Sequence, residues 1–154
     1  MKRYLLPLVA AIAALVLFAS AALAQSGHFV QTQTCRDIGT QVQCSGKVAG
    51  LGGTTFEIDV TAQGRATVEC TNPGGNVAPG QTFDFTAAGS SGPLATPRNG
   101  QFRYTVTTDA PSAPAGSCPN PMWSAEVVDV AFTTATITLR EDGVISDQVT
   151  VPVS

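Results

Sequence analysis

Apolar and polar side chains alternate along most of the chain. From residue 56 to 60 every second residue is apolar, and the same alternation returns from residue 66 to 70. Residues 62–65, Ala-Gln-Gly-Arg, separate the two stretches and are expected to turn the chain. A period of two places alternate side chains on opposite faces of a sheet and leaves no place for a helix to start. The pattern therefore predicts a hairpin with one solvated face.

Similar alternation recurs further along the chain. Residues 83–85, 102–107 and 144–153 each predict a half-buried strand. The C-terminal part adds a long stretch whose expected inward positions are Val128, Val130, Phe132, Ala135, Ile137 and Leu139. Glu141-Asp142-Gly143 follows it, and Asp-Gly at a bend is a strong hairpin signal.

Three segments interrupt the alternation and are expected to be loops. Residues 71–80 and 109–121 are rich in Pro and Gly, which remove ladder donors and regular dihedral angles. Residues 89–100 contain Ser-Ser-Gly-Pro and are expected to connect two sheets. Short strands at this spacing predict an all-β fold, an antiparallel β-sandwich of the immunoglobulin-like kind, with a small β-barrel as the alternative.

The first 24 residues have the organisation of a secretory signal peptide. Met1-Lys2-Arg3 is positive, residues 5–18 are apolar, and Ala22-Leu23-Ala24 supplies the small side chains that a signal peptidase requires. An uncleaved anchor is disfavoured because the apolar run is short for a membrane span and contains Pro7. We therefore expect residues 1–24 to be removed and residues 25–154 to form one soluble domain, secreted to the extracellular space or the periplasm.

Removal of the leader changes the charge of the chain. Lys2 and Arg3 leave with it while every carboxylate stays, so the mature domain is more acidic than the full chain at −3. A nucleic-acid surface needs clustered cations, and those that remain are scattered singly: Arg36, Lys47, Arg65, Arg98, Arg103 and Arg140. We expect neither a nucleic-acid partner nor insertion into a membrane.

The four cysteines all lie behind the leader, which predicts disulfides in an exported domain. Zinc is the alternative, but no C-x-x-C pair exists and His28 is the only histidine. Cys35 and Cys44 are equidistant from a turn at Gly39-Thr40, so a hairpin there sets them opposite each other. Cys70 and Cys118 are then left to form the second disulfide.

Three motifs stand in order behind the leader: residues 47–52 (KVAGLG), 70–76 (CTNPGGN) and 118–123 (CPNPMW). In these motifs the chain resembles a group of small secreted bacterial proteins, common in actinobacteria, without a characterised activity. The motifs carry turns and cysteines but no chemistry. The resemblance implies an exported all-β domain and the pairing of Cys70 with Cys118, and no activity.

The sequence contains no catalytic motif, and we expect no enzyme. His28 lies in the first residues of the mature chain, where an imidazole is poorly placed for nucleophilic catalysis. Residues 89–92 resemble a nucleophile elbow only superficially, because Pro93 replaces its second glycine. A carboxylate-based glycosidase is the remaining enzymatic alternative; its candidate acid pairs are Glu57 with Asp59 and Glu126 with Asp129.

No cofactor and no metal are expected. Glu141-Asp142 is the only adjacent acidic pair, and a calcium-binding loop pattern does not accompany it. A hairpin turn explains the pair without a cation.

The candidate ligand site is the end of the domain where the two Pro- and Gly-rich loops are expected to meet. An exposed indole beside amides can stack on a sugar ring or anchor a protein partner. The candidate residues are Trp123, Asn72, Asn76 and Asn120, with Met122 beside them. The alternative places Trp123 in the core against the disulfide. We therefore expect a non-catalytic binding or surface-interaction module for an extracellular glycan or protein, with a structural secreted protein as the second choice.

Overall fold

The computed structural model of the chain describes residues 26–154, and every regular element in that range is a β-strand. The expected signal peptide, residues 1–24, lies outside the described residues. The strands are β1 (His28–Asp37), β2 (Val42–Ala49), β3 (Thr55–Thr71), β4 (Val77–Pro79), β5 (Phe83–Ser90), β6 (Leu94–Ala95), β7 (Phe102–Thr107), β8 (Ser124–Glu141) and β9 (Val144–Pro152).

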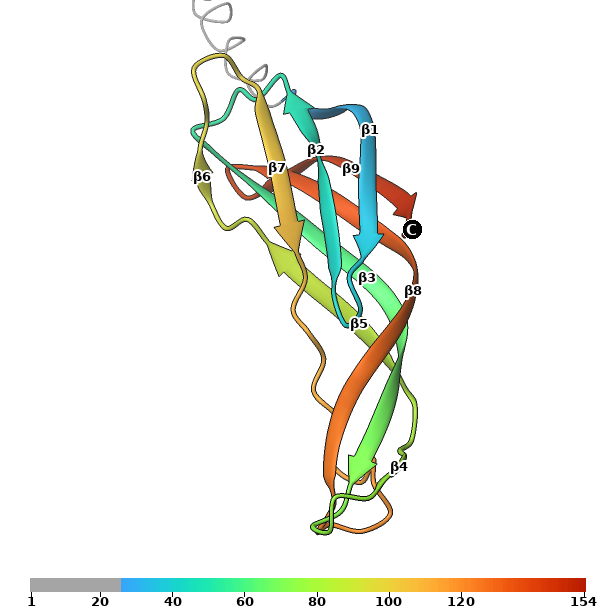
Figure 1. Ribbon diagram of the computed structural model, residues 1–154. Helices are drawn as coiled ribbons and strands as arrows, with labels where there is room; N and C mark the ends of the chain where they lie inside the picture. The colour runs from blue at the N-terminus through green and yellow to red at the C-terminus, as the bar shows by residue number, and fades with distance from the viewer. Residues whose placement is uncertain (1–25) are drawn as a thin grey trace, which may run out of the picture.

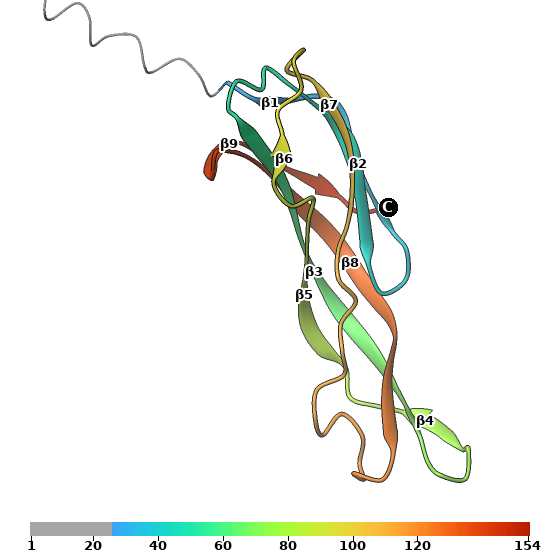
Figure 2. The same cartoon turned by 90° about the vertical axis from the view of Figure 1, so that its left-hand side faces the viewer.

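The strands form two antiparallel sheets. The smaller has the order β1-β2-β7, and the larger has the order β4-β3-β8-β9, with β5 and β6 also paired to β3. The smaller sheet covers only one half of the larger, while β3 and β8 continue beyond it (Figures 1 and 2). A single parallel bridge between Cys35 and Val153 links the sheets. The all-β sandwich is thus confirmed and the barrel alternative is wrong; the immunoglobulin-like subtype stays a prediction.

The turn expected at residues 62–65 is absent, and that prediction was wrong. β3 runs through this segment as one continuous strand, with a register shift against β8 between Gln63 and Gly64. Gly64 faces Phe132, and a Cβ atom there would lie 2.6 Å from Cγ1 of Val130. The glycine therefore permits close packing between the strands and does not reverse the chain.

A second correction concerns Val128, which is 42% exposed instead of facing the core. The pairing of β8 with β3 shifts between Thr67 and Val68, whose partners are Asp129 and Val127. Val128 is the extra residue of this bulge, and Val127 is partly buried in its place. The other expected inward residues of β8 are buried: Val130, Phe132, Ala135, Ile137 and Leu139.

The core lies between the two sheets and includes one buried polar pair, Gln33 and Tyr104. Phe56 and Phe102 make an edge-to-face contact with 5.0 Å between ring centroids. The register of β1 shifts between Val30 and Thr34, and Gln33 is buried there. Its Oε1 atom accepts a hydrogen bond of 2.7 Å from the Tyr104 hydroxyl, and burial raises the pKa of Tyr104.

Both expected disulfides are present. Cys35 and Cys44 are directly opposed partners of the β1–β2 hairpin. Cys70, at the end of β3, is bonded to Cys118 in the loop that precedes β8. Two disulfides are typical of a protein that folds in an oxidising extracellular or periplasmic environment. No helix that could cross a membrane occurs between residues 26 and 154.

Candidate functional site

The two Pro- and Gly-rich loops do meet at one end of the molecule, which we call the loop end: residues 71–82 and 110–123. It lies where β3 and β8 extend past the smaller sheet (Figure 1). The Gln81 N–H donates to the Ser117 carbonyl at 2.9 Å, and the Cys70–Cys118 disulfide joins the same segments. Val68 and Cys70 are buried here but do not belong to the main core cluster. The loop end is therefore a separate small packing unit.

A hollow of about 470 Å³ lies in this unit, and we call it the loop-end hollow. Its volume is within the range of small-molecule sites, roughly 300 to 1,000 Å³. None of the side chains that line it is charged. They include Pro114, Ser117, Cys118, Asn120, Pro121 and Trp123.

Trp123 is half-buried in the wall of the loop-end hollow. The backbone N–H of Trp123 donates to the Asn120 carbonyl at 3.0 Å, and the Asn120 side-chain oxygen accepts from the backbone N–H of Met122 at 2.9 Å. This turn places Asn120 and Trp123 together in the lining of the hollow. The indole is neither sealed in the core nor on an open face, and Cys118 lies in the same wall.

Asn72 and Asn76 do not line the loop-end hollow. They bind each other: the Asn72 side-chain oxygen accepts from the Asn76 N–H at 2.9 Å, and the Asn72 N–H donates to the Asn76 carbonyl at 3.0 Å. These bonds close the tight turn between β3 and β4. Of the four predicted ligand residues, the structure brings together only Trp123 and Asn120.

The candidate catalytic carboxylates have structural partners on the β3–β8 surface. Ser90 Oγ donates to Glu57 at 2.6 Å, and Arg140 Nε donates to Asp59 at 2.9 Å. Glu126 and Asp129 lie further along, opposite Glu69 and Thr67 in the pairing of β8 with β3. Among residues 26–154, no group of three His, Cys, Asp or Glu side chains is placed to hold a metal ion.

The acidic turn suggested for calcium binds the chain itself. Asp142 and Gly143 have φ values of 47° and 82°, as the confirmed two-residue hairpin requires. The carboxylate of Asp142 accepts hydrogen bonds from the hydroxyls and N–H groups of Thr54 and Thr55. The Thr54 hydroxyl and the two N–H groups lower the pKa of Asp142 to about 2.

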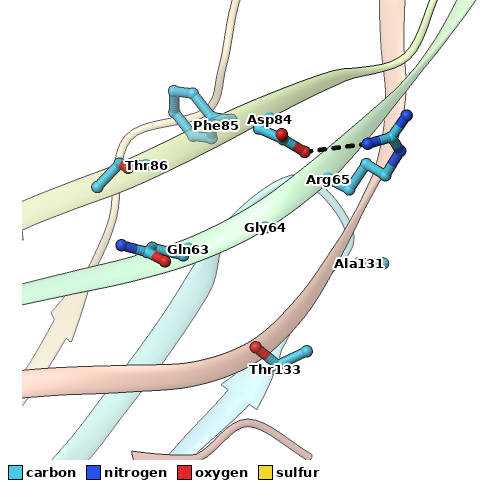
Figure 3. A pocket seen from close by; sticks show the side chains of 8 residues that line it. All are labelled: Gln63, Gly64, Arg65, Asp84, Phe85, Thr86, Ala131 and Thr133. Carbon is cyan, nitrogen blue, oxygen red and sulfur yellow. Dashed lines mark hydrogen bonds and ion pairs between the residues drawn. The ribbon is translucent and has the colours of Figure 1, made fainter.

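The outer face of the larger sheet contains two further hollows that the alternation did not predict. The first, of about 510 Å³, surrounds Gly64 and includes Arg65, Asp84 and Thr133 (Figure 3). The second, of about 390 Å³, includes Asp59 and Arg140. The first depends on the register shift at Gly64. The only sign of this shift in the sequence is in the numbering of the expected inward residues of β8: they fall on even-numbered positions up to Phe132 and on odd-numbered positions from Ala135.

No protein-family model matches the chain, and neither does any curated protein. Among solved structures, it is similar to "putative beta-galactosidase from Bacteroides fragilis" at 11% identity, with 82% of this chain and 17% of that chain covered and a TM-score of 0.35. It is also similar to a Bacteroides uniformis β-glucuronidase at 12% identity, with 82% and 14% covered and a TM-score of 0.32. The chain spans less than a fifth of the length of either protein.

Proposed function

We propose that the chain is a secreted, non-catalytic binding module that contacts its ligand through the loop-end hollow. The observation that carries this proposal is the position of Trp123, half-buried in an uncharged hollow at an end stapled by a disulfide. Half-exposed aromatic side chains in a fixed loop supply contact area at a low cost in conformational entropy. Removal of residues 1–24 and membership of the small secreted bacterial group are part of the same proposal.

The chemistry of the hollow favours a neutral ligand with an exposed ring. The indole offers an apolar face to a sugar ring, and the Asn120 side chain keeps its NH₂ group for a hydroxyl because its oxygen is engaged with Met122. A charged ligand would find no counter-charge in the lining. We therefore favour a neutral glycan as the ligand, and a protein partner is the other outcome of the test.

The test is a glycan array probed with residues 25–154, together with Trp123→Ala. Met122→Ala is the matched control, because Met122 is adjacent and 73% exposed but does not line the hollow. We expect the tryptophan substitution to weaken binding at least tenfold and the methionine substitution to leave it unchanged. Trp123 is the only tryptophan of the chain, so a ligand-induced change in fluorescence reports on this site alone.

Three outcomes would oppose the proposal. Retained binding by Trp123→Ala would remove the loop-end hollow as the site. No ligand among glycans or extracellular proteins would favour the structural secreted protein. Release of reducing ends from a glycan, lost on Glu57→Gln or Asp59→Asn, would establish the glycosidase instead.

A further inference from the structure

The outer face of the larger sheet presents a row of small and polar side chains. From residue 59 to 65, the outward residues of β3 are Asp59, Thr61, Gln63 and Arg65. Their partners on β5 are Ser90, Ala88, Thr86 and Asp84. On the other side β8 contributes Arg140, Thr138, Thr136, Thr134, Thr133 and Ala131. We call this surface the outer track.

The two hollows of the outer face lie at opposite ends of the outer track. Asp59 marks one and Arg65 the other, six residues along an extended strand. At a strand rise of about 3.3 Å per residue, Asp59 and Arg65 are separated by roughly 20 Å, the length of about four linked pyranose rings. The facing edges of the two hollows, at Thr61 and Gln63, are only two residues apart. No residue of the loop-end hollow belongs to this surface.

Each hollow contains one arginine that is already paired with an aspartate. Arg65 Nη1 lies 3.1 Å from Asp84, with the side chains 63% and 86% exposed. Figure 3 shows these two side chains pointing toward each other beside Gly64. At the other end, Arg140 Nε lies 2.9 Å from Asp59. Since the arginines are paired in this way, the outer track has no free cationic centre for an anionic polymer.

The same pairs are suited to a hydroxyl-rich ligand. A carboxylate held by one guanidinium nitrogen keeps lone pairs that accept from a hydroxyl. Arg65 Nη2 already donates to the Thr82 hydroxyl at 2.8 Å, and the N–H groups that are left can donate to a ligand hydroxyl. The exposed side chains of Thr61, Gln63 and Thr134 extend this capacity between the two ends. Thr136 and Thr138 already bond to Thr150 and Gln148 of β9, and Thr138 is buried. The first hollow lies at the register shift beside Gly64 and the extra residue Thr133.

We propose that the outer track binds a neutral polysaccharide, whose chain lies along β3 and contacts the Arg65–Asp84 hollow and the Arg140–Asp59 hollow at once. Each contact alone is weak, because it consists of exposed polar groups that also bind water. Two sites on one chain gain from effective concentration, so affinity rises once the ligand spans both. This proposal does not depend on the ligand of the loop-end hollow.

The experiment measures retention of residues 25–154 on insoluble neutral polysaccharides: cellulose, xylan, mannan and starch. Soluble oligomers of the polysaccharide that binds then compete for the protein. We expect oligomers of four or more units to compete at least about tenfold better than the dimer, because only they reach both arginine–aspartate pairs. Heparin and polygalacturonate, which are anionic, are expected not to compete.

Two substitutions test the surface, each with a match on the smaller sheet. Arg65→Ala removes the guanidinium of one hollow, and Arg103→Ala removes an exposed strand arginine from β7. Thr61→Lys obstructs the middle of the outer track, and Thr105→Lys makes the same change on β7. The first variant of each pair is expected to lose retention at least about fivefold, and its match to keep it, with unchanged circular dichroism in all four.

The proposal would be overturned by failure of the folded protein to bind any of the four polysaccharides. Equal retention of Thr61→Lys and Thr105→Lys, or no dependence on oligomer length, would also overturn it. Trp123→Ala is expected to retain polysaccharide binding. Its loss there would assign the binding to the loop-end hollow and leave the outer track without a ligand.

Discussion

The carboxylate of Glu141 accepts a hydrogen bond from the backbone N–H of Gly27, with 2.8 Å between Oε2 and N. Its other oxygen accepts from the N–H groups of Gly52 and Gly53 at 2.7 and 3.2 Å. Glu141 is fully buried, and a Cβ atom on Gly27 would lie 2.6 Å from its Oε2. One carboxylate thus joins the residues before β1, the loop before β3 and the end of β8.

Glu141→Ala is expected to lower the free energy of unfolding by about 2 to 4 kcal/mol, because it leaves buried N–H donors without an acceptor. Urea unfolding at neutral pH measures the change. Glu126→Ala is the control: it removes an exposed carboxylate from the same strand and should cost less than about 0.5 kcal/mol. Equal effects of the two substitutions would contradict a structural role for the buried carboxylate.

Loss of the Cys70–Cys118 disulfide is expected to loosen the loop end more than the sandwich. The sequence separation of 48 residues gives a stabilisation of about 4 kcal/mol in the chain-entropy treatment, against roughly 3 for the separation of 9 between Cys35 and Cys44. Hydrogen exchange of a Cys70→Ser, Cys118→Ser variant should show faster exchange in residues 110–123, with β1 and β2 still protected. Uniform loss of protection would show that the loop end and the sandwich unfold together.

Asp142 is expected to make stability depend on pH at the acidic end. Its folded pKa, lowered to about 2 from the ordinary 3.8, means that the ionised group contributes stability fully above pH 3.8, and that this contribution is lost as the pH falls through about 2. Asp142→Asn should therefore lower Tm at pH 7, with a difference that narrows between about pH 4 and 2. NMR titration of the carboxyl group measures the pKa directly, and Thr54→Val is expected to raise it.

Gly64→Ala tests the close approach of β3 to β8. The added methyl group would meet Val130, so we expect a loss of about 1 to 3 kcal/mol in the free energy of unfolding from overpacking. Val130→Ala in the same chain should recover part of this loss, which a double-mutant cycle from urea unfolding measures. Additive effects of the two substitutions would place the cause outside this contact.

The alternation of side chains predicted the strand character of β3, β5, β7, β8 and β9, and the cysteine spacing predicted the β1–β2 hairpin with its disulfide, because period and turn position act locally. The short strands β4 and β6 lie in segments that were expected to be loops. A glycine among polar residues, however, can mark either a turn or a close approach of two strands, and the neighbouring sequence does not distinguish them. At Gly64 the sequence favoured a turn, and the decisive neighbours Val130 and Phe132 lie more than 60 positions away. The burial of Glu141 was hidden for the same reason: an acid beside Asp-Gly is normally solvated, and only the distant N–H groups of Gly27 and Gly52 explain it.

The candidate site was predicted in part. Trp123 and Asn120 share a wall because they are three residues apart in one turn. Asn72 and Asn76 were expected beside Trp123 because the Cys70–Cys118 disulfide joins the two loops. Instead, these two asparagines are hydrogen-bonded to each other in the turn between β3 and β4. The hollows of the outer track depend on the twist and register of β3, β5 and β8. The sequence of a single strand does not determine how it is registered against its neighbours.

The long β3–β8 pair also separates the loop end from both ends of the described chain. The Ser26 hydroxyl donates to the Gly50 carbonyl and the Ser154 N–H donates to the Cys35 carbonyl, so both residues lie beside the smaller sheet. The loops lie at the opposite end of the molecule (Figures 1 and 2). A fluorophore, affinity tag or solid support attached at residue 26 or residue 154 would therefore leave the Trp123 hollow unobstructed. The protein can thus be immobilised through either of these two positions for surface-based binding measurements.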